Sequence, residues 1–317
     1  MKRAVLLLAL LVLPAASRAA AGRGPIALVT AESQNQLLAI DVDSGRIIRR
    51  LAMPADPENV EAYAGEAAVV SARGGAVTLL NPHTLSVWRV LRGFGSPHIA
   101  AFTPGGDYLY VTDDARGQLV VILNRVVRKI FVGYGAHHMA FSPDQRRLWI
   151  ALGERARSIA VVDTHNPEHP RLLGHVDPHG AAHDLAFTPD GRYVWVTYDD
   201  GPYLRTFDAR TGRPLRTLYA GSPPAHVRFD DAAGLARFSR YAYVTSGNGA
   251  LLRVFDWRRR QLARVLRTSP GAYNLAVDQG LVATSSLTGG TVIAFRGGRL
   301  LLSERVAPAA RDVALVP

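Results

Sequence analysis

The chain contains no cysteine among its 317 residues. This absence excludes disulfide bonds, thiolate nucleophiles, cysteine-ligated zinc, iron–sulfur clusters and covalently attached c-type haem. Hydrophobic residues make up 48% of the chain, which is enough for a sizeable core and argues against disorder. Packing and hydrogen bonding must therefore hold the fold together without covalent cross-links.

Lysine is almost as scarce, since it occurs only at Lys2 and Lys129, and the formal net charge of +11 comes from arginine. The arginines are scattered, apart from the run at residues 258–260. A nucleic-acid groove requires clustered positive charge with interleaved aromatic side chains. We therefore interpret the charge as a solvated basic surface and expect no nucleic-acid partner.

Long apolar runs are missing except near the start, where residues 4–13 follow Lys2 and Arg3 and precede small residues at 19–21. A run of about ten apolar residues is too short to cross a bilayer, but it is typical of a cleavable signal peptide. We expect residues 1–21 to be removed. The mature protein is then expected to be secreted or periplasmic and not membrane-spanning.

Helical periodicity is also absent from the rest of the chain, which instead repeats one phrase. The phrase contains a shared phenylalanine, followed by a turn and a second apolar run. Its clearest copies are SPHIAAFTPGGDYLYVT (96–112), GAHHMAFSPDQRRLWIA (135–151), AAHDLAFTPDGRYVWVT (181–197) and PAHVRFDDAAGLARFSRYAYVT (224–245). Weaker copies begin at residues 57, 271 and 309. Phe102, Phe141, Phe187 and Phe229 recur at intervals of 39, 46 and 42 residues, which indicates a repeat architecture.

Each repeat carries four short strand signals separated by turn residues. Seven such units predict an all-β fold, a seven-bladed β-propeller of four-stranded antiparallel blades over residues 25–317. The first unit has only three strands, at 26–30, 37–41 and 46–51, while residues 311–316 form a strand without followers. The two chain ends are therefore expected to complete one blade and close the ring of a monomer.

The second apolar run of the repeat is similar to the YVTN family of β-propeller repeats. The phrases that carry the resemblance are ALVTAES (27–33), YVTDD (110–114), VWVTYDD (194–200) and YVTSGN (243–248). The second and seventh units depart from it, with Val70-Ser71 and Ala283-Thr284 at the centre of the motif. The resemblance implies a secreted bacterial propeller, a family mostly without assigned activity. Relatives of similar architecture include lactonases, streptogramin lyases, and haem d1- or copper-binding propeller domains.

Polar residues gather where the inner strands begin, at one mouth of the central channel. Five of the ten histidines fall there. The residue pairs at these starts are Glu58-Asn59, His98-Ile99, His137-His138, His183-Asp184, Ala225-His226, Tyr273-Asn274 and Arg311-Asp312. Neighbouring loops add further carboxylates. The candidate ligand-binding residues are therefore His98, His137, His138, His183, Asp184, His226, Asn274, Asp312, Asp113 and Asp199.

Three interpretations of this mouth remain open: polar groups that satisfy backbone and water, a metal or small-ligand site, and a catalytic site. His98, His137 and His183 each lie four residues before the shared phenylalanine, so we expect them to approach one another as ligands of a divalent metal. Adjacent strand residues point to opposite faces, so His137 and His138 are not expected to share one role.

The function expected is an exported binding module that uses this mouth for a small ligand, a metal or a partner protein. The alternative is a metal-assisted lactonase or lyase at the same place. No catalytic residue is assigned. Trp149 and Trp195 hold matching positions in neighbouring repeats and are expected to pack between blades.

Overall fold

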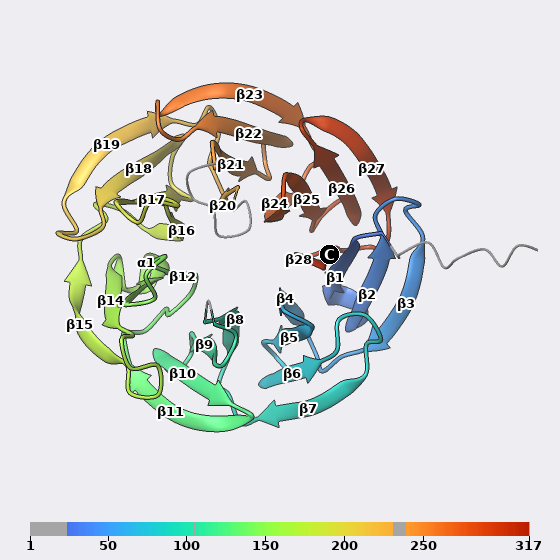
Figure 1. Ribbon diagram of the computed structural model, residues 1–317, viewed down its shortest axis with the longest axis horizontal. Coiled ribbons are helices and arrows are strands. Elements are labelled where there is room, and N and C mark those ends of the chain that lie inside the picture. Colours follow the sequence, from blue (N-terminus) through green and yellow to red (C-terminus); the bar gives the residue numbers. More distant parts are fainter. Residues whose placement is uncertain (1–23, 104, 231–238, 317) are drawn as a thin grey trace, which may run out of the picture.

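The structure is a computed structural model that describes residues 24–103, 105–230 and 239–316. It is a seven-bladed β-propeller with four antiparallel strands in each blade, as expected (Figure 1). The proposed signal peptide lies outside the described residues. Among the residues described, none of the helices has the length and apolar character needed to cross a membrane.

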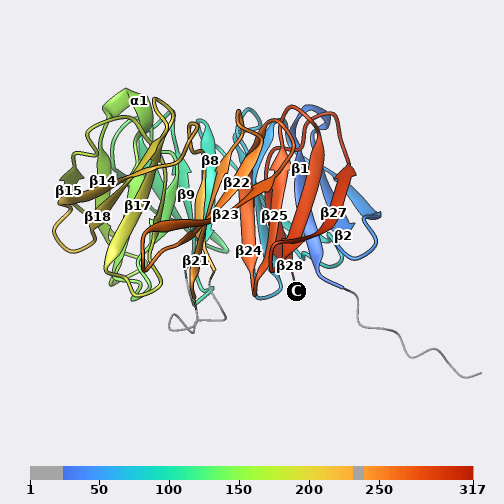
Figure 2. The same ribbon diagram turned by 90° about the horizontal axis from the view of Figure 1, so that it is seen from above.

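The blades are numbered here in chain order, and each is given from its inner to its outer strand. Blade 1 comprises β28 (Val313–Val316), β1 (Ile26–Ala31), β2 (Gln36–Asp41) and β3 (Ile47–Ala52); blade 2 comprises β4 (Pro57–Tyr63), β5 (Glu66–Ser71), β6 (Ala76–Leu80) and β7 (Val87–Arg92). Blade 3 comprises β8 (Pro97–Phe102), β9 (Leu109–Asp113), β10 (Gln118–Leu123) and β11 (Arg125–Phe131); blade 4 comprises β12 (Met139–Phe141), β13 (Arg147–Ala151), β14 (Ile159–Asp163) and β15 (Arg171–Val176). Blade 5 comprises β16 (Ala182–Phe187), β17 (Tyr193–Tyr198), β18 (Tyr203–Asp208) and β19 (Pro214–Tyr219); blade 6 comprises β20 (Val227–Phe229), β21 (Tyr241–Ser246), β22 (Leu251–Asp256) and β23 (Gln261–Arg267). Blade 7 comprises β24 (Ala272–Asp278), β25 (Leu281–Ser286), β26 (Thr291–Arg296) and β27 (Arg299–Arg305). The helices are the 3-10 turn η1 (Glu32–Gln34) and the single turn α1 (Gly153–Ala156), which lies on one face of the ring (Figure 2).

The core consists of apolar layers between neighbouring blades rather than one central mass. Trp149 of β13 packs against Phe187 of the next blade, with ring centroids 5.8 Å apart, and Trp195 packs against Phe229, at 5.5 Å. Both tryptophans are 1% exposed, which confirms their expected place between blades. The middle strands are therefore buried on both sides, and this explains their nearly continuous apolar sequences.

The outer strands are exposed and carry arginines, among them Arg49 and Arg50 of β3, Arg125 and Arg128 of β11, and Arg264 and Arg267 of β23. In every blade the pairing of the third and fourth strands shifts register once, as at Val121/Ile122 and Val161/Val162. Such bulges increase strand twist, which lets the outer strand follow the rim. Charge and bulges together protect these edges from pairing with other chains.

Hydroxyl groups of the second strands tie each inner strand to the next blade. Thr112 accepts the N–H of Ile99 (3.1 Å) in its own blade and donates to the carbonyl of His137 (2.8 Å) in the following one. Thr197 joins Asp184 to Ala225 in the same way, Thr245 joins His226 to Tyr273, and Ser285 donates to the carbonyl of Arg311. These bridges fix the height at which successive inner strands begin.

Ring closure is achieved as expected from the sequence. Strand β28 pairs antiparallel with β1, from Val29 opposite Val313 to Ile26 opposite Val316. Its residues are all below 10% exposed and pack into the layers on both sides of blade 1.

Deleting residues 309–317 should therefore destabilise the whole propeller by several kcal/mol, because four buried residues and a strand pairing are lost. Thermal unfolding followed by circular dichroism would measure this. Leu300→Ala on the outer strand, where the side chain is 55% exposed, is the control and should change stability by under ~0.5 kcal/mol. An unchanged melting temperature after the deletion would contradict closure by β28.

Candidate metal-binding site

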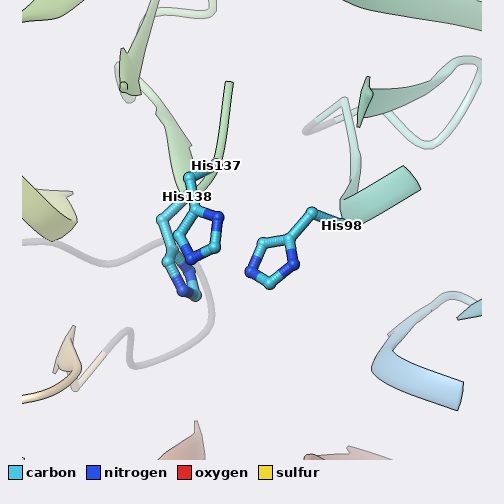
Figure 3. A group of neighbouring side chains, drawn as sticks. All are labelled: His98, His137 and His138. Atoms are coloured by element: carbon cyan, nitrogen blue, oxygen red, sulfur yellow. The ribbon is translucent and has the colours of Figure 1, made fainter. Parts of the chain in front are cut away.

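Five imidazoles from four consecutive blades meet where the inner strands begin. His98 belongs to β8, His137 and His138 directly precede β12, His183 belongs to β16, and His226 directly precedes β20. Figure 3 shows the rings of His98, His137 and His138 pointing toward one another from two neighbouring blades. The structure places His98, His137 and His183 in the wall of one cavity at this mouth.

The rings divide into two groups that share His138. Ligand nitrogens of His98, His137 and His138 lie within 4.8 Å of one another, and so do those of His138, His183 and His226. We call these the His98 group and the His226 group. The trio expected from the shared sequence offset is thus split between the groups, and His138 and His226 complete them.

The two groups differ in how their rings are oriented. In the His98 group, the rings of His98 and His137 are stacked, with centroids 3.5 Å apart and planes at 13°. In the His226 group the ring of His226 stands at 84° to that of His138 and at 85° to that of His183. The remaining pair, His138 and His183, is tilted by 43°.

Strand alternation predicts that His137 and His138 point to opposite faces, and the structure differs from this; that the two residues take separate roles stays a prediction. Their ring centroids lie 4.9 Å apart and both rings belong to the cluster. Regular pairing in β12 starts only at Met139, so the strict alternation of a strand does not apply to the two residues before it.

A carboxylate faces Nδ1 of four of the five imidazoles. Glu58 Oε2 lies 2.8 Å from His98 Nδ1, and Asp199 Oδ2 lies 3.0 Å from His183 Nδ1. The two oxygens of Asp184 lie 3.5 Å from Nδ1 of His138 and of His226. A carboxylate behind one ring nitrogen favours the tautomer that leaves the other nitrogen, Nε2, free to bind a ligand.

Asp184 has a structural contact as well. Its Oδ2 accepts the N–H of Val227 (2.9 Å), the first residue of the next inner strand. Asn59 Oδ1 and Asp312 Oδ2, at the matching position of other blades, accept the N–H groups of Ala100 and Val60. The other oxygen, Asp184 Oδ1, and His138 Nδ1 are buried and make no hydrogen bond to another described residue. This carboxylate therefore joins two blades with one oxygen and faces the imidazoles with both.

Burial keeps four of the five imidazoles uncharged. Desolvation lowers the pKa of His98 to about 3, helped by the positive charge of Arg311. Desolvation also holds the pKa of His137, His138 and His226 well below the usual value, and each imidazole disfavours protonation of its neighbours. Burial alone would raise the pKa of Asp199, but the hydrogen bond with His183, together with the electrostatic interactions with His183 and His137, lowers it. Neutral imidazoles and charged carboxylates are the forms that bind cations.

The imidazoles line a cavity of about 290 Å³. Its other walls include Glu58, Tyr273, Asn274 and Arg311. Arg311 reaches Glu32 (3.1 Å) and Glu58 (3.9 Å), so the mouth carries paired rather than isolated charges. A second cavity of about 230 Å³ shares His137, His183 and Asp199 with the first and reaches α1.

Three further candidate residues, Asn274, Asp312 and Asp113, lie outside the imidazole cluster. Asn274 lines the cavity and donates to the carbonyl of Arg311 (2.7 Å). Asp312 is 7% exposed and accepts from Asn59 (2.7 Å) and Val60 (3.0 Å) at a blade boundary. Asp113 is fully buried and accepts the N–H groups of Gly95 and Ser96, so it shapes a loop rather than the cavity.

Sequence reasoning missed Arg228, which donates to Asp184 Oδ2 at 2.8 Å. The repeats do contain a signal for it. Arg228 lies one residue before the shared phenylalanine, and this position is alanine in five of the seven blades. The five alanines are Ala101, Ala140, Ala186, Ala276 and Ala314, and the seventh residue is Glu61.

No protein-family model matches the chain, and no curated protein sequence matches it. Solved structures match over nearly its whole length. A functionally unknown protein from Desulfotomaculum acetoxidans has a TM-score of 0.78 at 15% identity, covering 92% of this chain and 98% of its own. Apo AztD from Citrobacter koseri has a TM-score of 0.70 at 11% sequence identity, and the match covers 92% of this chain and 97% of that chain. The structure of the dihydro-heme d1 dehydrogenase NirN in complex with DHE has a TM-score of 0.66 at 16% sequence identity. The match covers 93% of this chain and 66% of that chain. These likenesses show the propeller fold, and the YVTN resemblance rests on the sequence phrases alone.

The neutral imidazoles make the stability of the metal-free protein pH-dependent. In the unfolded chain they take up protons near pH 6.5, whereas the folded pKa values are lower, so the unfolded state binds more protons below that pH. The free energy of unfolding should therefore fall as the pH is lowered, by up to about 1.4 kcal/mol per pH unit for each such histidine. Urea unfolding at pH 7.5 and 5.5 measures this. A double variant, His98→Gln with His226→Gln, should show a smaller difference, and an equal one would contradict the prediction.

Proposed function

We propose that this protein is an exported binding module that holds one transition-metal ion, of the zinc class, through Nε2 of His138, His183 and His226. The observation that carries the proposal is the combination of converging imidazoles with a carboxylate at each Nδ1. This carboxylate–imidazole pairing is the usual support of histidine metal ligands.

Ring orientation favours the His226 group over the His98 group. The lone pair of an imidazole nitrogen lies in the ring plane, so several rings bind one ion only where their planes meet. The planes of His138 and His226 are nearly perpendicular and can share such a point. The stacked rings of His98 and His137 are nearly parallel, and an ion in one plane would lie roughly a stacking distance outside the other.

The donor set selects the class of ion. Neutral imidazoles suit Zn²⁺, Cu²⁺, Ni²⁺ and Co²⁺, whereas Mg²⁺ and Ca²⁺ prefer all-oxygen sites. Without cysteine, the site lacks the thiolates that soft ions favour. Three protein ligands leave one position of a tetrahedral ion for water or a ligand in the 290 Å³ cavity.

Residues 1–21 support export as part of this proposal, because their basic start and short apolar run are typical of a signal peptide. A metal-assisted lactonase or lyase remains the alternative, since an open coordination position could activate water. Propellers host both binding and catalysis, so the fold does not choose between them. The binding role requires only the donor groups described above.

Purified, untagged protein stripped with a chelator should bind one Zn²⁺ per chain in isothermal titration calorimetry. His138→Ala and His226→Ala should each weaken binding by ~100-fold or more, because a ligand is lost. His98→Ala should change the affinity by less than about threefold. His83→Ala, on an exposed histidine away from the mouth, is the control and should change nothing.

Native mass spectrometry of the same samples would give the number of bound ions. Binding that is unaffected by His138→Ala and His226→Ala would overturn the proposed site, and a wild-type protein that binds none of Zn²⁺, Cu²⁺, Ni²⁺ or Co²⁺ would overturn metal binding itself. Tight binding of Mg²⁺ in preference to Zn²⁺ would contradict the imidazole donor set.

A further inference from the structure

Arg228 stands directly behind the carboxylate that supports two of the proposed ligands. Its guanidinium donates to Asp184 Oδ2 at 2.8 Å, and the same nitrogen donates to the carbonyl of Val227 at 2.8 Å. The Asp184 side chain is fully buried, whereas that of Arg228 is 37% exposed. The arginine thus reaches a buried carboxylate from a solvated side.

The two oxygens of Asp184 are used unequally. Oδ2 accepts both the Val227 N–H and the Arg228 guanidinium, so two strong donors hold it. Oδ1 has no hydrogen-bond donor among the described residues and lies 3.5 Å from His138 Nδ1. With Oδ2 fixed at two points, the carboxylate plane is set, and with it the direction in which Oδ1 meets the imidazole.

A comparison with another blade separates the role of Arg228 from that of the blade contact. Asp312 occupies the matching position in blade 1 and makes the matching blade contact, to the N–H of Val60. The side chain that donates to it is the amide of Asn59, at 2.7 Å, and not an arginine. Closing a blade boundary therefore does not require a guanidinium on this carboxylate. The arginine is found at the aspartate that faces two imidazoles.

We infer that Arg228 is a positioning residue for the metal site, which acts through Asp184 to orient His138 and His226. The inference rests on the proposed function, because it concerns the support of the same ligands. Arg228 touches no ion itself. It neutralises the buried carboxylate and fixes its orientation, so that Asp184 faces Nδ1 of both imidazoles, at 3.5 Å, without itself competing for the ion.

The test compares Zn²⁺ affinity in wild-type protein with that in Arg228→Met and Arg228→Lys. Loss of such a supporting contact typically weakens metal binding ~10- to 100-fold, and we expect this for Arg228→Met. Lysine can reach one oxygen but lacks the planar fork, so Arg228→Lys should lie between methionine and wild type. Bound Co²⁺ should show altered visible absorption in Arg228→Met, because the ligand geometry has changed.

Two control variants separate positioning from stability. Glu61→Gln changes the charge at the matching position of blade 2, which interacts electrostatically with Arg228, and should leave Zn²⁺ affinity within about threefold. Asp312→Asn weakens a blade boundary without imidazoles, so it should lower the melting temperature but not the affinity. Asp184→Asn should lower both.

The outcomes are distinct for the two proposals. If wild-type protein binds Zn²⁺ and both Arg228 variants bind it with unchanged affinity and Co²⁺ spectrum, the positioning role is overturned while the site stands. If Arg228→Met does not fold, the Zn²⁺ affinity and the Co²⁺ spectrum of Arg228→Lys test the positioning role instead. If wild-type protein binds no ion, the proposed function fails and the positioning role fails with it.

Discussion

The arrangement of the mouth depends on a hydroxyl bridge between neighbouring inner strands. Thr112, Thr197 and Thr245 each accept an N–H in their own blade and donate to the carbonyl that begins the next blade. A repeated bridge of this kind sets successive strand starts at one height, whatever side chains those starts carry. Side chains at equal sequence offsets must then meet around the channel, and in this chain many of them are histidines.

This constraint explains why much of the fold and part of the site could be predicted from the sequence. The offset from the shared phenylalanine is a local property, and the bridge converts it into a position in space. It correctly brought His98, His137 and His183 to one place. The division into two groups could not be predicted in this way, because it depends on side-chain torsions that the spacing of residues does not encode.

Side-chain contacts across blade boundaries were harder still to predict from the sequence. Arg228 reaches Asp184, which precedes it by 44 positions, and only the departure from alanine at its place in the repeat marks it as unusual. The alternation rule failed at His137 and His138 because it holds for paired strand residues, and pairing begins just after them at Met139. Both cases concern residues at or just before the start of an inner strand, which is where the site lies.

Burial favours the neutral form of His98, His137, His138 and His226, since each proton added to one of them would be buried beside the other rings. The same burial that lowers their pKa therefore removes the proton as a competitor for the ring nitrogens near neutral pH. A cation that binds there would place a positive charge close to the carboxylates of Asp184 and Asp199. The cost of assembling the cluster in the metal-free protein and its suitability for a metal thus have one physical origin, the exclusion of water at the start of the inner strands.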